Sequence, residues 1–156
     1  MNPFETPSGL RAAFDTLLTS VPRQLRLYDR DLSAFDLDDP ARHARVRTAC
    51  LAGGGHRIEL LLDTIDHVAR DCPRLMQLVR DFGHVLEIRQ ADPALPRPDH
   101  AFVLADRRAV LMRADKHALR GTLHPDDTRR ATQLNQEFEA LWQRSPASVS
   151  ATTLGL

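Results

Sequence analysis

The residue types that carry out most enzyme chemistry are all present in this 156-residue chain, but few have the spacing that catalysis requires. The seven histidines are scattered, with no HxH or HxxxH pair, whereas zinc ligands usually come at least partly in close pairs. No GxSxG sequence is present to anchor a serine nucleophile. Neighbouring carboxylates, such as Asp38 and Asp39, lie in loops or at expected helix starts, where they accept hydrogen bonds from free backbone N–H groups. We therefore expect no metal site and no cofactor.

The cysteines and the glycine cluster also favour structural roles. Cys50 and Cys72 fall within helical patterns without a CxxC pair, so we expect them to be small apolar core residues, as in a cytoplasmic protein. The glycines at 53–55 end a helix and precede a strand, which is the reverse of the strand–loop–helix order that binds phosphate. They indicate a helix C-cap followed by a turn.

The most informative stretch for function begins at residue 99 and reads DHAFVLAD. His100 opens an expected strand and Asp106 occupies an expected hairpin turn. A second strand follows at 109–112, and the last helix carries the sequence FEALW at 138–142. This order resembles the second half of a phospholipase D-type domain.

The first half of the chain is similar to that family in outline. RQLRLYDRDL (23–32) resembles its first strand and HRIELLLD (56–63) its second. More narrowly, the chain resembles a group of uncharacterised proteobacterial domains of phospholipase D-like shape, some of them linked to acetyltransferase-like domains. The markers of that group are YDxDL at 28–32, FxLAD at 102–106 and FxxLW at 138–142.

The resemblance implies a site and a way of assembling. In the phospholipase D family, a histidine attacks phosphorus, a lysine two residues later binds the phosphate oxygens, and a downstream aspartate supports the histidine. Two such motifs face each other across a pseudo-dyad or a dimer. The resemblance therefore makes His100 and Asp106 catalytic candidates, and Tyr28 and Asp29 ligand-binding candidates. Arg113 is a further ligand-binding candidate, because an arginine could supply positive charge, although with a different geometry from lysine. It also implies a homodimer or a partnership with another protein domain.

The departures from the motif argue against catalysis. Phe102 occupies the place of the lysine, Asp106 comes one residue early, and the glycine-serine-asparagine run that follows the motif is replaced by residues 112–115. The only lysine of the chain, Lys116, lies ten residues beyond Asp106. Because loss of one group that stabilises developing charge typically costs about 10²–10³ in rate, this degenerate His–Lys–Asp (HKD) motif predicts a non-catalytic domain. His100 is then a strand-end histidine, and Asp106 a turn residue.

The elements that must position these residues follow from apolar periodicity and breaker residues. Helices are expected to begin near Ser8, Pro40, Asp71 and Pro125, and strands are expected between them at 24–29, 56–63, 85–89, 101–105, 109–112 and near 120–123. Early alternation of strands and helices predicts parallel pairing, and the hairpin adds an antiparallel part. We expect an α/β fold, with a mixed, mostly parallel sheet flanked by helices on both faces, as in one phospholipase D-like half.

Length and composition limit the classes of function. The chain predicts a single domain, 1–156, with a core at about 8–145 and a loosely ordered tail at 146–156. Its formal net charge is zero, and it has neither a signal peptide nor a long apolar run. We expect a soluble, cytoplasmic protein without a membrane partner.

Three hypotheses for function remain open. The first is a non-catalytic phospholipase D-like binding or interaction domain, with homodimerisation. The second is a phosphodiesterase-type hydrolase with a rearranged site around His100. The third is a nucleic-acid or anion-binding domain that uses arginine pairs such as Arg107/Arg108 and Arg129/Arg130, although zero net charge and few aromatic residues count against nucleic acid.

Overall fold

The computed structural model describes residues 1–145 of the chain. The expected tail at 146–156 lies outside the described residues. The described elements, in chain order, are β1 (Asn2–Phe4), α1 (Pro7–Thr19), β2 (Gln24–Asp29), the 3₁₀ helix η1 (Ser33–Phe35), α2 (Pro40–Leu51), β3 (Arg57–Leu62), α3 (Asp66–Asp71), α4 (Pro73–Asp81), β4 (Leu86–Gln90), β5 (Ala101–Ala105), β6 (Ala109–Arg113), β7 (Gly121–His124) and α5 (Thr128–Gln143).

The strands of residues 1–145 form one seven-stranded sheet in the order β1-β7-β6-β5-β2-β3-β4. Only β2–β3 and β3–β4 pair in parallel, whereas β1–β7, β2–β5, β5–β6 and β6–β7 are antiparallel. The prediction of a mostly parallel sheet is therefore wrong. Parallel neighbours need a crossover connection, and helical crossovers join only the three strands β2, β3 and β4. The later strands are joined by short connections, which favour antiparallel pairing.

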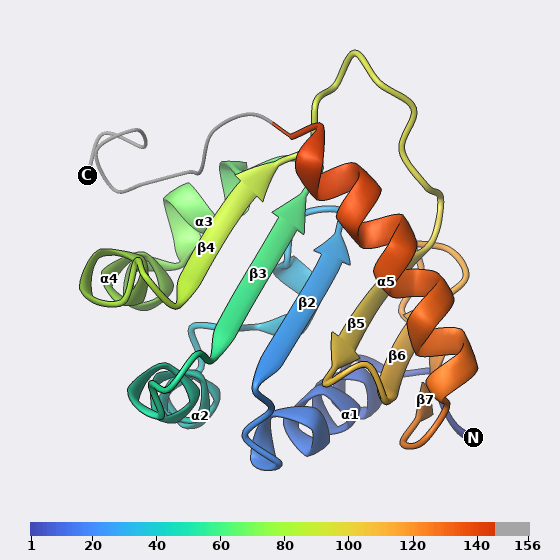
Figure 1. Cartoon of the computed structure of the whole chain (residues 1–156), viewed down its shortest axis with the longest axis horizontal. Helices are drawn as coiled ribbons and strands as arrows, with labels where there is room; N and C mark the ends of the chain where they lie inside the picture. Colours follow the sequence, from blue (N-terminus) through green and yellow to red (C-terminus); the bar gives the residue numbers. More distant parts are fainter. Residues whose placement is uncertain (146–156) are drawn as a thin grey trace.

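Helices cover the two faces of the sheet unequally (Figure 1). On one face, α1, α2, α3 and α4 pack with Leu25 and Leu27 of β2 in the larger apolar core. On the other face, α5 packs over a smaller core that contains Tyr28 and Phe102. Alternation of side chains along β2 therefore sends Leu27 into one core and Tyr28 into the other.

The N-terminal segment differs from its prediction. Helix α1 begins at Pro7, one residue before Ser8, and its N-cap is Thr6, whose side chain accepts a hydrogen bond from the backbone N–H of Gly9. The preceding strand β1, which the sequence did not predict, pairs with β7, so the ordered fold starts before residue 8. Three residues are too few for a periodic pattern, and the pairing partner lies more than a hundred residues away.

Other local expectations agree with the structure. Gly53, Gly54 and Gly55 all have positive φ angles and follow the end of α2, as a helix C-cap and turn require. Cys50 and Cys72 are buried, and burial raises the pKa of their thiols to about 11 and about 12. Within residues 1–145 no helix is long and apolar enough to cross a bilayer.

Candidate functional site

The sequence YDRDL forms a tight turn at the carboxyl end of β2. Oδ2 of Asp29 accepts hydrogen bonds from the backbone N–H groups of Leu32 (2.8 Å) and Asp31 (3.2 Å). Leu32 is held at φ 71° and leads directly into η1. Such a left-handed conformation costs a non-glycine residue on the order of 1–2 kcal/mol and is often found at functional sites.

Asp29 also joins this turn to β6. Its Oδ1 accepts a hydrogen bond from the guanidinium of Arg113, and both residues are buried. A second nitrogen of Arg113 donates to the carbonyl of Ala118 at 2.8 Å, so the same guanidinium also holds the loop after β6. Burial raises the pKa of the Asp29 carboxyl, while Arg113 and the backbone donors of the turn oppose that shift.

Lys116 ties the ends of β2 and β3 to the same loop. Its Nζ lies 2.6 Å from Oδ2 of Asp63, which directly follows β3, and 3.1 Å from the Tyr28 hydroxyl. The Tyr28 hydroxyl donates in turn to Oδ1 of Asp63 at 2.7 Å. Burial, together with this bond to a carboxylate, holds the pKa of Tyr28 far above its usual value, so Tyr28 stays a hydrogen-bond donor.

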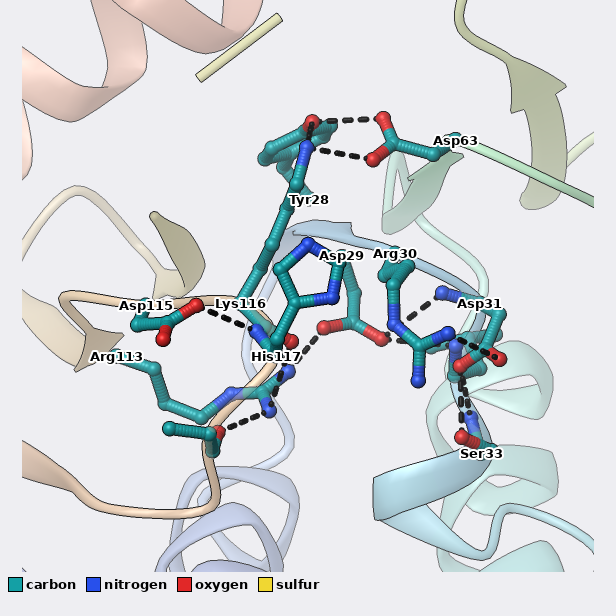
Figure 2. Close-up of polar contacts among 12 residues, drawn as sticks. Tyr28, Asp29, Arg30, Asp31, Ser33, Asp63, Arg113, Asp115, Lys116 and His117 are labelled. Carbon is teal, nitrogen blue, oxygen red and sulfur yellow. Dashed lines mark hydrogen bonds and ion pairs between the residues drawn. The ribbon is translucent and has the colours of Figure 1, made fainter. Parts of the chain in front are cut away.

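A small polar pocket of about 140 Å³ lies against these two networks (Figure 2). Residues from the YDRDL turn, from η1 and from the loop after β6 line it: Asp29, Arg30, Asp31, Ser33, Ala34, Arg113, Lys116, His117 and Leu119. Asp29, Arg113 and Lys116 are buried or nearly so, whereas His117 is exposed at the rim. The pocket therefore combines charged groups that are held by partners, such as Asp29 and Lys116, with the exposed imidazole of His117. Such an arrangement is suited to binding a small polar ligand.

The structure brings some of the predicted site residues together and separates others. Tyr28, Asp29 and Arg113 all belong to the two networks at this end of the sheet. His100 lies at the start of β5, where its Nε2 is 2.9 Å from Oε1 of Glu137 on α5, although not in hydrogen-bond alignment. Asp106 lies at the other end of β5, where its Oδ1 accepts a hydrogen bond from the backbone N–H of Gln24.

Phe102, two residues after His100, belongs to the core beneath α5. It is fully buried, and its ring lies 6.0 Å from Tyr28, 5.7 Å from His100 and 6.4 Å from Phe138, measured between ring centroids. Lys116 does not lie at the place of Phe102, because its ammonium is bound to Asp63 and to the Tyr28 hydroxyl.

The sequence did not point to several residues of the pocket, or to Asp63, which binds the pocket residue Lys116. Asp63 ends a strand parallel to β2, and the carboxyl ends of neighbouring parallel strands meet at one edge of a sheet, so its place near Tyr28 could have been inferred. The place of Lys116 in the chain, ten residues beyond Asp106, did not indicate its contact with Tyr28 and Asp63. Nothing in the sequence pattern distinguishes Arg30, Ser33 or His117, because loop geometry brings them together.

The mixed sheet with helices on both faces is a fold that this chain shares with solved structures of the phospholipase D family. Nuc from Salmonella typhimurium, a phospholipase D family member, has a TM-score of 0.58 and 11% identity over 88% of this chain and 91% of its own. Phosphatidylserine synthase from Haemophilus influenzae has a TM-score of 0.58 and 16% identity over 95% of this chain. The archaeal chromatin protein TrmBL2, described as showing a novel mode of DNA binding, has a TM-score of 0.71 and 16% identity over 94%.

By its sequence, the chain belongs to the family described as Domain of unknown function (DUF7931), whose model matches residues 6–154. No curated protein matches the sequence. The chain spans 52% of TrmBL2 and 39% of the synthase. At these identities, the likeness to the solved structures shows the fold alone.

Proposed function

We propose that this chain is a non-catalytic phospholipase D-like binding domain of the cytoplasm, which holds a small polar ligand in the pocket at the carboxyl end of β2. The observation that carries the proposal is the burial of Phe102 at the motif position of the lysine. Phosphoryl transfer relies on cations that stabilise charge developing on the phosphate oxygens, and a phenyl ring cannot replace one.

Two features of the pocket support ligand binding there. The charged groups that form its floor are fixed by partners from distant segments, such as Asp29 by Arg113 and Lys116 by Asp63. Pre-organised groups of this kind lower the entropy cost of binding. The left-handed conformation of Leu32 is a second sign, because strain persists where function maintains it.

The binding proposal is tested by thermal shift of the purified chain with AMP, inorganic phosphate, citrate and glucose. A ligand that binds the native state raises the melting temperature. We expect at least one compound to do so, and His117→Ala to weaken its apparent affinity by roughly tenfold. His84→Ala is the matched control, because His84 is exposed before β4 and outside the pocket. The proposal fails if none of the compounds binds, or if His117→Ala leaves binding unchanged.

Homodimerisation is part of the proposal. The large hydrophobic residues exposed within residues 1–145 are Met1, Leu51 and Leu119, so a dimer of this chain would rely mainly on polar contacts. Size-exclusion chromatography with light scattering tests it. Twice the chain mass at micromolar concentration supports the dimer, and a single chain mass at every concentration rejects it.

A phosphodiesterase site around His100 is the second candidate function. Glu137 is the observation that favours it, because a carboxylate beside an imidazole can orient the ring and stabilise its charged form. Asp106 offers no such support, since it lies at the far end of β5. A nucleophilic histidine would carry a phosphoryl group after incubation with a phosphodiester, detectable by mass spectrometry on the peptide that contains His100. We expect that peptide to stay unmodified.

Nucleic-acid binding through arginine pairs is a third candidate, and the described DNA binding of TrmBL2 is its one link to a structural neighbour. Arg108 is engaged by Asp126 at 3.1 Å and Arg130 by Asp127 at 3.2 Å, which leaves less free positive charge than the sequence suggests. Fluorescence anisotropy with a labelled DNA duplex tests this candidate. Phosphate contacts would make the affinity fall steeply with added salt, and salt-independent affinity would exclude them.

A further inference from the structure

The hairpin turn between β5 and β6 has a backbone conformation that disfavours arginine, and yet Arg107 occupies it. The N–H of Arg108 donates to the carbonyl of Ala105 at 3.1 Å, and the two central residues, Asp106 and Arg107, have φ angles of 54° and 57°. Two positive φ angles define a type I′ turn, in which asparagine, aspartate and above all glycine are favoured. An arginine at the second position therefore carries a conformational cost.

Asp106 has a structural reason to be in this turn, and Arg107 has none. Both the backbone N–H and the side chain of Asp106 bind β2: the N–H donates to the carbonyl of Gln24, and Oδ1 accepts from the N–H of Gln24, each at 3.0 Å. Arg107 is exposed and makes no hydrogen bond or ion pair with any residue between 1 and 145. Its neighbour Arg108, in contrast, is paired with Asp126.

Arg107 lies at a groove between the turn, the sheet and α5. The groove has a volume of about 450 Å³ and is lined by Arg26, Arg107, Thr132, Asn135, Gln136 and Glu139. A volume of that size is typical of small-molecule sites. Since Asp106 binds the first residue of β2, the groove lies at the opposite end of that strand from the pocket beside Asp29.

The floor of this groove is rigid and polar. Arg26 is buried, and its guanidinium donates to Glu59 at 3.0 Å, Glu139 at 2.7 Å and Asn135 at 3.4 Å. It also lies over the ring of Phe138, 5.1 Å from the ring centroid. Arg26 is engaged by Glu59 and Glu139, so Arg107 is the cation of the groove lining that has no partner among residues 1–145.

We propose that this groove is a second binding site, which takes a small polar molecule through a carboxylate or phosphate group held by Arg107. A guanidinium can bind either oxyanion through two parallel N–H···O bonds. The amide of Gln136 and the carboxylate of Glu139 lie on the groove wall formed by α5 and offer hydrogen bonds to the rest of the molecule. The ligand thus accounts for an unpaired arginine in a conformation that favours glycine.

The test follows the side-chain Nε–Hε signals of the arginines by NMR during titration of the full chain with citrate and, separately, with inorganic phosphate. We expect saturable shifts of the Arg107 signal with at least one probe. In Arg107→Gln, the affinity measured on the remaining signals of the groove should fall by roughly tenfold or more. Arg108→Gln is the matched control, since it removes the same charge one residue away and should leave the affinity unchanged. The tighter of the two probes identifies the oxyanion.

Three results would overturn this site. One is the absence of saturable binding with both probes. The second is binding that Arg107→Gln leaves intact. The third is an equal loss in Arg107→Gln and Arg108→Gln, because that indicates a general charge effect. His117→Ala separates this proposal from the proposed function: it should not alter binding at the groove, and Arg107→Gln should not alter binding at the pocket beside Asp29.

Discussion

At the scale of single residues, Phe102 is the residue on which the proposal of a non-catalytic domain rests. Its ring fills the core between Tyr28 of β2 and Phe138 of α5. A lysine at this position would have to bury an ammonium group among aromatic rings or displace α5 to reach water. The packing around Phe102 is therefore incompatible with a charged side chain at this position.

The first prediction concerns that position. Phe102→Lys should lower the free energy of unfolding by about 3–5 kcal/mol or more, because it removes a buried ring and adds an unpaired charge. Phe102→Leu, which keeps the position apolar, should cost distinctly less. Urea denaturation followed by circular dichroism measures both. A Phe102→Lys protein as stable as the wild type would show that the position opens onto a polar site.

The second prediction concerns Asp31 at the rim of the pocket. Burial by itself would raise the pKa of Asp31, but the hydroxyl and backbone N–H of Ser33, which donate to it at 2.7 and 2.9 Å, bring the pKa below its usual value. An aspartate whose pKa is lowered by folding stabilises the native state above its unfolded pKa of about 3.9, and this contribution is lost as the pH falls through the folded pKa.

Ser33→Ala should therefore destabilise the protein by about 1 kcal/mol at neutral pH, through loss of one hydrogen bond to a charged group. The difference from the wild type should be smaller at about pH 2 than at neutral pH, because the contribution of the ionised Asp31 is lost as the pH falls from the unfolded pKa of about 3.9 through the lowered folded pKa. Denaturation curves of both proteins at the two pH values measure this. An equal difference at both would contradict the assignment of the bond to the ionised carboxylate.

At the scale of elements, the β5–β6 hairpin combines structure with the second proposed site. Its turn positions Arg107 at the groove in a conformation that a glycine would adopt without strain. Asp106 instead fastens the turn to the start of β2. Stability and ligand binding are therefore expected to respond in opposite directions to changes at Arg107.

The third prediction follows from this opposition. Arg107→Gly should raise the free energy of unfolding by about 0.5–1 kcal/mol, because it relieves the left-handed strain at some cost in chain entropy. Arg108→Gly should lower it by a similar amount, since Arg108 has no positive φ angle and pairs with Asp126. Thermal unfolding of the two variants provides the comparison. If Arg107→Gly destabilised the protein, the left-handed conformation of Arg107 would not be a source of strain.

Elements fixed by local pattern could be predicted from the sequence, and their long-range pairing could not. The apolar stripe of α5 and the hairpin around Asp106 are local features, and both are present. The antiparallel pairing of β2 with β5 joins segments more than seventy residues apart, and no local pattern specifies it. Tyr28 and Asp29 could be named from the YDxDL marker and Arg113 as a possible source of positive charge, whereas the contact of Lys116 with Asp63 depends on how the sheet brings the strand ends together.

At the scale of the whole molecule, Lys116 links separate segments at one end of the sheet. It connects the loop after β6 to Asp63 after β3 and to Tyr28 in β2, and its side chain is 9% exposed. In the sheet, β5 separates β6 from β2, and β3 lies beyond β2. Lys116 therefore connects the loop after β6 to two strands that are not neighbours of β6. Its role in this structure is therefore to hold the loop that carries His117.

The fourth prediction tests that role. Lys116→Met should lower the free energy of unfolding by about 2–3 kcal/mol, because Asp63 would keep Tyr28 and a longer contact to Arg97 but lose its closest cation. Hydrogen exchange should also become faster in the loop at 114–119. Lys116→Arg should restore only part of the stability, since a planar guanidinium does not fit a site built for an ammonium. Wild-type stability of Lys116→Met would contradict the role of this contact.

The central claim is that this phospholipase D-like domain binds a ligand without phosphodiester chemistry. The most direct test is hydrolysis of bis(4-nitrophenyl) phosphate by the purified full chain, compared with His100→Ala at equal concentration and with folding verified by circular dichroism. We predict the same background rate for both proteins. A wild-type rate clearly above that of a folded His100→Ala variant would contradict the claim and make His100 a catalytic residue.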